Sequence, residues 1–143
     1  MRKIVGIAVL VFVSALLSGQ VPEPEHVTVQ HILIAFQGTI PDAGITRVLE
    51  DAQKLAQELL MRARQGEDFD ALVRQYTNDA YPGIYSIANA GRAPDAANQE
   101  FSRSRMVKAF GDVSFGLKVG EIGMAVYDRV TSKYGWHIIK RLK

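Results

Sequence analysis

Two strand-like runs, one near each end of the chain, constrain its fold most. The first covers residues 27–36 and the last covers residues 134–141. Both are rich in β-branched and aromatic residues, which favour strands, and each holds one histidine among apolar neighbours, His31 or His137. If the two strands pair, the chain holds two facing imidazole rings.

Alternation along the closing run decides which way its histidine points. Successive residues of a strand point to opposite faces of the sheet. His137 therefore shares a face with Ile139, and Trp136 shares the opposite face with Ile138. We expect His137 to point inward together with Ile139.

Helical spacing of apolar residues marks the part of the chain that follows the first run. Over residues 46–65 they recur every three or four positions, which predicts one long helix with a single buried stripe. A second, shorter helix is predicted from the acidic cap Asp68 to about Tyr76, where apolar residues occur at i, i+3, i+4 and i+7.

The second half of the chain is less regular. Residues 80–100 contain two prolines and two glycines and are predicted to form a loop. A short helix over residues 104–110 and a third strand over residues 124–127 follow, and residues 128–133 join that strand to the last one as a hairpin. This order predicts an α+β domain in which the first and last strands lie side by side in the sheet centre.

The N-terminal residues differ in composition from the rest. Arg2 and Lys3 precede an apolar run and then small residues, which is the layout of a secretory signal. The run is shorter than the roughly 20 residues of a membrane span. We therefore expect residues 1–19 to be a signal peptide, residues 20–25 a linker and residues 26–143 one domain.

An uncleaved N-terminal anchor is the alternative to a signal peptide. Either way the domain would lie outside the cytoplasmic membrane, in the periplasm, the cell envelope or the medium. Contact with a membrane is expected only through an uncleaved N-terminal segment.

The charge of the chain argues against nucleic acid as a partner. Two of its 17 Lys and Arg residues are Arg2 and Lys3, so 15 remain against 15 Asp and Glu in the rest of the chain. No later cluster of basic residues with interleaved aromatics occurs. The mature domain would be close to neutral.

Two kinds of site are not expected from the sequence. The chain has no cysteine, and no carboxylate stands at ligand spacing from its histidines, so we expect no metal site. The Gly-x-Ser-x-Gly pattern of a hydrolase nucleophile is also absent. Taken alone, His31 and His137 would be interpreted as core histidines. For Asp79, a residue that ends a helix and a residue of a functional site are equally good interpretations.

Five short segments occur in the order in which one protein family carries them. They are QHILI at residues 30–34, GEDFDAL at 66–72, YTND at 76–79, FGLKVGEI at 115–122 and YGWHIIKR at 134–141. In this order they resemble the parvulin-type peptidyl-prolyl cis/trans isomerases, and the resemblance extends from about Val29 to the C-terminus.

The resemblance implies a small antiparallel four-stranded sheet surrounded by helices. It also implies isomerisation of X-Pro bonds in unfolded or exported polypeptides, without a cofactor. By position, the catalytic residues would be His31, Asp79 and His137, and Met106 and Phe110 would form the apolar proline pocket. Phe115 or Leu117 would stand behind this pocket, which completes the expected set of substrate-binding residues.

Such a site would need no covalent chemistry. Rotation about the bond removes amide resonance, which is the origin of a barrier of roughly 18–20 kcal/mol. An apolar slot for the proline ring can favour the twisted, less polar amide. The two imidazoles would then be structural support, and the Asp79 carboxylate would disfavour charge on the substrate carbonyl oxygen.

Departures from the family pattern leave other functions open. Residues 94–100 replace a glycine-rich segment that is usual in the family, and Val107 stands where a glutamine is frequent. The main alternative is a chaperone-like module that binds extended segments without catalysis, and a further one is an interaction domain tethered by its N-terminus. Residues 36–46 contain no Lys or Arg, so recognition of phosphoserine is not expected.

Overall fold

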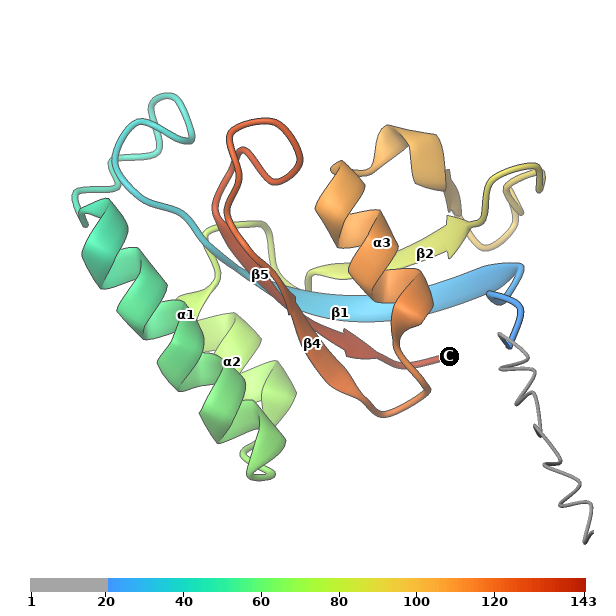
Figure 1. The fold of residues 1–143 in the computed structure, drawn as a ribbon, viewed down its shortest axis with the longest axis horizontal. Coiled ribbons are helices and arrows are strands. Elements are labelled where there is room, and N and C mark those ends of the chain that lie inside the picture. Colours follow the sequence, from blue (N-terminus) through green and yellow to red (C-terminus); the bar gives the residue numbers. More distant parts are fainter. Residues whose placement is uncertain (1–20) are drawn as a thin grey trace, which may run out of the picture.

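One sheet organises the computed structural model of the chain, which describes residues 21–143 (Figure 1). The elements are β1 (His26–Ile34), α1 (Leu49–Arg64), α2 (Phe69–Tyr76), β2 (Ile84–Ala88), β3 (Phe101–Ser102), η1 (Arg103–Arg105), α3 (Lys108–Gly116), β4 (Ile122–Ala125) and β5 (Trp136–Arg141). Residues 1–19, the predicted signal peptide or anchor, lie outside the described residues. Among the helices of residues 21–143, none has both the length and the apolar character that crossing a membrane requires.

The sheet has the strand order β3-β2-β1-β5-β4. Only the β2–β3 pair is parallel, and the other three pairs are antiparallel. The α+β class is therefore confirmed, and β1 and β5 lie side by side near the sheet centre as predicted. The expected count of four strands is wrong, because residues 21–143 form five.

The difference arises in residues 80–100, which were predicted to be a loop. With β5 on one side, the backbone of β1 still presents N–H and C=O groups on the other side, and these need partners. β2 supplies them along residues 26–30 of β1. β3 then adds a short edge next to β2.

Helix boundaries also differ from the predicted ones. α1 begins three residues later than expected, while the cap of α2 is confirmed, since the Asp68 carboxylate accepts a hydrogen bond from Ala71 N at 2.8 Å. The single helix predicted over residues 104–110 is instead η1 followed by α3. Met106 and Val107 between them have extended backbone angles, which ends the first and delays the second.

Two apolar cores lie on opposite faces of the sheet. α1 and α2 pack on one face, against residues that include Ile32 and Ile138. α3 packs on the other face, against Val29 and Ile139 (Figure 1). The predicted alternation of β5 is therefore confirmed.

A glycine allows β5 to begin close to the end of β1. Gly135 has φ +143°, and a Cβ placed on it would lie 2.1 Å from the carbonyl oxygen of Ile34. No other residue fits so near a neighbouring backbone. The close approach fixes the register in which β5 enters the sheet.

Candidate functional site

The two histidines meet on the face of the sheet that α3 covers. In the antiparallel pairing, Leu33 lies opposite His137 and His31 lies opposite Ile139, so the imidazoles are diagonal neighbours. Their Nδ1 atoms are 3.1 Å apart and the ring planes differ by 18°. Both residues are buried, with 3% and 4% of their surface exposed.

The segment after α2 brings Asp79 to this pair. Beyond Gln30, where pairing with β2 stops, residues 77 and 78 occupy the free edge of β1. Leu33 N donates to Thr77 Oγ1, and Asn78 N donates to the carbonyl oxygen of Leu33. This attachment explains the role of the Tyr-Thr-Asn-Asp segment, because it holds Asp79, the next residue, beside His31.

The Asp79 carboxylate is held by two side-chain donors and one backbone donor, Ala80 N. Its Oδ2 accepts from Nε2 of His31 and from the hydroxyl of Tyr85, each at 2.9 Å. The His31 hydrogen bond, with smaller contributions from Ala80 N and Tyr85, holds the pKa of Asp79 well below its ordinary value. Burial, together with the nearby carboxylate, raises the pKa of Tyr85 to about 12. Asp79 is thus an anion and Tyr85 a neutral donor near pH 7.

These contacts fix where the protons lie. A carboxylate only accepts, so Nε2 of His31 donates to Asp79. When Nε2 carries the only ring proton of His31, its Nδ1 accepts from Nδ1–H of His137. Burial, with the neighbouring His31 as the second cause, lowers the pKa of His137 to about 3. Nε2 of His137 is buried and has no hydrogen-bond partner within residues 21–143.

A cavity of about 370 Å³ opens beside this chain of polar groups. Met106, Val107 and Phe110 form an apolar wall on the side of α3. The Phe110 ring stands edge-on to both imidazoles, at 5.1 Å and 5.4 Å between centroids. The remaining lining residues are His31, Leu33, Ile40, Asn78, Asp79, Tyr85, Arg105, Tyr134 and His137.

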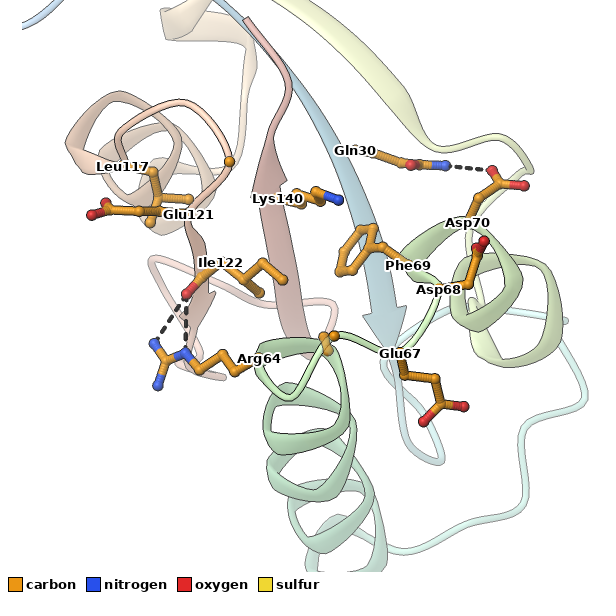
Figure 2. Close-up of a pocket in the computed structure, with 13 residues that line it drawn as sticks. Gln30, Arg64, Glu67, Asp68, Phe69, Asp70, Leu117, Glu121, Ile122 and Lys140 are labelled. Atoms are coloured by element: carbon orange, nitrogen blue, oxygen red, sulfur yellow. Dashed lines mark hydrogen bonds between the residues drawn. The ribbon is translucent and has the colours of Figure 1, made fainter.

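Five of the seven predicted site residues line this cavity, and Phe115 and Leu117 do not. Phe115 is buried beneath the Arg103 guanidinium, 4.7 Å from its ring centroid. Leu117 lies after the end of α3 and lines a different cavity (Figure 2). Five residues along a helix turn the Phe115 side chain well away from the direction of Phe110. Phe115 packs in the same apolar core as Phe110, and Leu117 packs against that core, without lining the smaller cavity.

The second cavity is larger, at about 920 Å³, and opens on the opposite face of the sheet between α1, α2 and β4 (Figure 2). Most of its polar side chains already have hydrogen-bond partners. Arg64 donates to the carbonyl oxygen of Ile122, and Gln30 donates to Asp70. None of the predicted catalytic residues lies there. We take the smaller cavity as the candidate site.

Four of the lining residues that carry a ring, a charge or a partly buried apolar side chain were not predicted from the sequence. They are Ile40, Tyr85, Arg105 and Tyr134. Only Tyr85 lies in a run of mostly apolar residues, at 84–88, and that run is too short to be recognised as a strand from the sequence. The other three come from loops and from η1, where no periodic pattern predicts direction.

The altered segment at residues 94–100 lies outside the cavity lining. It is held locally, since Asp95 N donates to Glu100 and the Glu100 carboxylate pairs with His26 at 3.0 Å. Within residues 21–143 no group of three or more His, Cys, Asp or Glu side chains is arranged to bind a metal ion.

Comparisons with known proteins agree with this geometry. The family model described as PPIC-type PPIase domain matches residues 16–143. Foldase protein PrsA of Geobacillus sp. (strain WCH70) is 31% identical over 119 residues, which are 82% of this chain and 38% of that protein. Chaperone SurA of Chromohalobacter salexigens is 34% identical over 113 residues, 78% of this chain and 21% of that protein.

A solved structure shares the fold. The solution structure of TbPIN1 superimposes with a TM-score of 0.58 at 25% identity, covering 83% of this chain and 98% of that one. By contrast, the chain spans less than two fifths of the length of the two curated relatives named above.

Proposed function

Because the chain belongs to the family of PPIC-type peptidyl-prolyl isomerase domains, we propose that it isomerises X-Pro bonds in unfolded or exported polypeptides. The observation that carries the proposal is an apolar slot beside an anchored carboxylate. Met106 and Phe110 line the same cavity as Asp79, and Asp79 is tied to the buried histidine pair.

The slot would act by binding the proline ring while the amide twists. Planar amide resonance places negative charge on the carbonyl oxygen and is lost at the transition state. An apolar wall solvates the planar, more polar amide poorly compared with water, and so favours the twisted form. Val107 extends this wall with a third apolar side chain.

Asp79 would act through its charge. Its Oδ2 is occupied by His31 and Tyr85, and its Oδ1 accepts from Ala80 N. An anion whose pKa is lowered far below neutrality is a poor proton donor or acceptor near pH 7. Placed near the substrate carbonyl, it would oppose negative charge on that oxygen and so weaken the resonance that resists rotation.

The histidines would hold this carboxylate in place. His31 binds it directly, and His137 fixes the tautomer and orientation of His31 through the Nδ1–Nδ1 hydrogen bond. Because His137 is neutral and buried, it carries no charge to the substrate. We therefore expect the isomerisation rate to change little between pH 7 and pH 9.

A module that binds clients without catalysis is the second candidate. Val107 favours it, because this lining residue offers no side-chain hydrogen bond to a peptide. A similar protein is named Chaperone SurA, and binding in the same cavity would need only the apolar wall.

A protease-coupled assay on proline tetrapeptides separates the two. We expect the wild-type chain to accelerate isomerisation in proportion to its concentration, and Met106→Ala to lower kcat/KM with little change in unfolding temperature. Met61→Ala, an exposed methionine outside the cavity, is the matched control. No acceleration, combined with suppressed aggregation of an unfolded client, would favour the binding module.

We also propose that the domain works outside the cytoplasmic membrane, in keeping with the signal-like composition of residues 1–19. Expression of the whole sequence followed by mass measurement of the mature chain tests this. Loss of a segment ending near residue 19 and recovery outside the cytoplasm are expected. A full-length product retained in the cytoplasm would contradict the proposal.

A further inference from the structure

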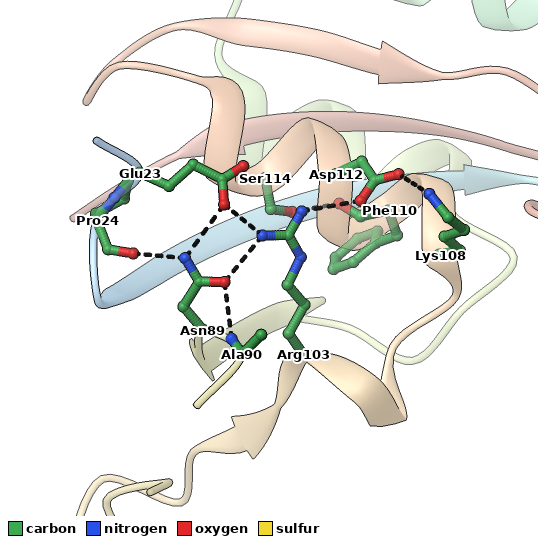
Figure 3. Close-up of polar contacts among 9 residues, drawn as sticks. All are labelled: Glu23, Pro24, Asn89, Ala90, Arg103, Lys108, Phe110, Asp112 and Ser114. Carbon is green, nitrogen blue, oxygen red and sulfur yellow. Dashed lines mark hydrogen bonds and ion pairs between the residues drawn. The ribbon is translucent and has the colours of Figure 1, made fainter. Parts of the chain in front are cut away.

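Two arginines of the turn η1 differ completely in their partners. The Arg103 guanidinium, with 19% of the side chain exposed, donates to Glu23 at 2.7 Å, Asn89 at 2.9 Å and Asp112 at 2.8 Å (Figure 3). It also covers the ring of Phe115. Its hydrogen-bonding capacity is therefore used in tying η1 to α3, to the end of β2 and to the segment before β1.

Arg105, two residues further on, is exposed and lines the candidate site. Its guanidinium lies 5.8 Å from the ring centroid of Phe101, a cation–π distance. Within residues 21–143 no carboxylate pairs with it, whereas Arg103 in the same turn pairs with two. The positive charge at this edge of the cavity is thus held in position without being neutralised.

The other formal charge in the cavity lining lies deeper. Asp79 is the only lining residue among Asp and Glu, and Arg105 the only one among Lys and Arg. The Asp79 side chain is 31% exposed, and Oδ2 is already engaged by two donors. A polypeptide entering the cavity therefore meets an unpaired cation at the edge and a hydrogen-bonded anion inside.

We propose that Arg105 gives the site a preference for an acidic side chain directly next to the proline. The inference rests on the proposed function, because it assumes that the proline ring occupies the slot of Met106 and Phe110. Arg105 precedes Met106 in the sequence, and neighbouring residues of a bound peptide are about 3.8 Å apart between Cα atoms. The residue beside the proline therefore passes within reach of the guanidinium.

The chemistry of the side chain suits this role. A guanidinium presents a planar fork of donors that matches a carboxylate, and it keeps its charge at any physiological pH. The turn that carries it is anchored by Arg103, so little backbone freedom is lost when a client binds. Because the pair would remain at the solvent edge, the expected discrimination is modest, roughly 1.5- to 5-fold, and falls as salt rises.

Two sets of tetrapeptides test the proposal, one with Glu, Gln or Lys before the proline and one with the same residues after it. kcat/KM is measured for the wild type, Arg105→Gln and Arg105→Glu at low and high ionic strength. In at least one set, the wild type should rank Glu above Gln above Lys. Arg105→Gln should remove the ranking and Arg105→Glu should reverse it.

Lys118→Glu is the matched control, since it makes the same charge change at an exposed residue outside the cavity. Its ranking should equal that of the wild type. Thermal unfolding of each variant confirms folding, and Arg105→Gln remains informative if the charge reversal destabilises the turn.

Binding of the same peptides, labelled with a fluorophore, is followed by anisotropy in parallel. Equal kcat/KM and equal affinity of the wild type for Glu and Lys peptides would overturn the role of Arg105. An unchanged ranking in Arg105→Glu would also overturn it. Absence of any rate acceleration with the charge ranking retained in affinity refutes the isomerase function alone.

Discussion

Two cavities of this domain open on opposite faces of the same strand pair, β1 and β5, and they differ in volume and in the chemistry of their lining. The larger one, about 920 Å³, is lined by polar side chains most of which already have hydrogen-bond partners. The smaller one, about 370 Å³, has an apolar wall and holds the groups with the largest pKa shifts of the described carboxylates and histidines. Chemistry rather than volume therefore distinguishes the candidate site.

A single step along β1 separates the two environments. Gln30 faces the larger cavity and His31 the smaller, because neighbouring strand residues point to opposite faces. The Gln30 amide binds an exposed carboxylate, Asp70, whereas His31 binds a half-buried one, Asp79. Water can replace the first contact more readily than the second, and this difference sets the size of the effects expected below.

Removal of one aromatic ring from each cavity should give the largest effects and the clearest contrast. Phe110→Ala and Phe69→Ala each remove a buried ring, so each is expected to cost about 3–5 kcal/mol of unfolding free energy. The milder Phe110→Leu and Phe69→Leu pair is then assayed well below the unfolding temperature. Only Phe110→Leu should lower kcat/KM, and an equal loss in both would remove the distinction between the cavities.

The next largest losses of unfolding free energy are expected when polar residues on β1 and β5 are replaced. His31→Leu removes one of the donors to Asp79 and leaves Nδ1 of the buried His137 without its acceptor, at about 1–3 kcal/mol for the buried unsatisfied group. His137→Leu should cost less, since its Nε2 already lacks a partner within residues 21–143. Gln30→Leu, on the opposite face, should cost least.

Urea unfolding at pH 7.5 measures this ranking. A His31→Leu or His137→Leu variant with full stability and no activity would show that the histidines act on the substrate and do not merely support Asp79.

The pH dependence of the unfolding free energy should also be determined by groups of the smaller cavity, His137 and Asp79. The pKa of His137 is about 3 in the folded protein against an ordinary 6.5, so below about pH 6.5 the unfolded chain binds a proton that the folded one does not. The contribution of the neutral ring is complete above pH 6.5 and is lost as pH falls, with a slope approaching about 1.4 kcal/mol per pH unit. Asp79, whose pKa is lowered, adds a further loss below its ordinary 3.8.

Unfolding titrations at pH 7.5, 6, 5 and 4 check the slope. His137→Leu should flatten it between pH 6 and pH 4, whereas Asp70→Asn in the other cavity should leave it unchanged in that range. A wild-type curve that is flat from pH 7.5 to pH 4 would contradict burial of a neutral His137.

The smallest effect is expected for two matched tyrosine hydroxyls. Tyr85 donates to Asp79, and Tyr81 donates to the exposed Asp70 at 3.0 Å. Tyr85→Phe should cost about 0.5–1.5 kcal/mol and slow isomerisation a few-fold, because Asp79 loses one of its two Oδ2 donors. Tyr81→Phe should change neither measurably. Equal rates in the two variants would show that this hydroxyl does not contribute.

Much of the site was predictable because strand alternation is strict. The positions of His31 and His137 within two strand-like runs were enough to place both rings on one face and in contact. Asp79 followed from a family pattern, and the structure supplies its reason, the attachment of residues 77 and 78 to β1.

Other parts were not predictable from pattern. β2 is five residues long and follows a Pro-Gly pair, so the periodic signal that would place Tyr85 is too short to recognise. Phe115 and Leu117 were expected to bind substrate because apolar spacing does not distinguish side chains that line a cavity from those that pack in the core next to it. No sequence pattern indicated that Arg105 lines the cavity, since its position depends on a turn that the side-chain contacts of Arg103 stabilise.

The pairing of β1 with β5 also sets the order in which the domain can assemble. The two imidazoles in contact are 106 residues apart in the sequence, so this strand pair closes nearly the whole domain into one loop. Long-range pairing of this kind slows folding, because the entropy of loop closure is lost before the new contacts compensate for it. During synthesis β1 has no neighbour on one side until β5 is complete. The centre of the sheet and the histidine pair of the candidate site both require β5, so they form in the same step. Until β5 is made, the domain is itself an unfolded chain of the kind on which it is proposed to act.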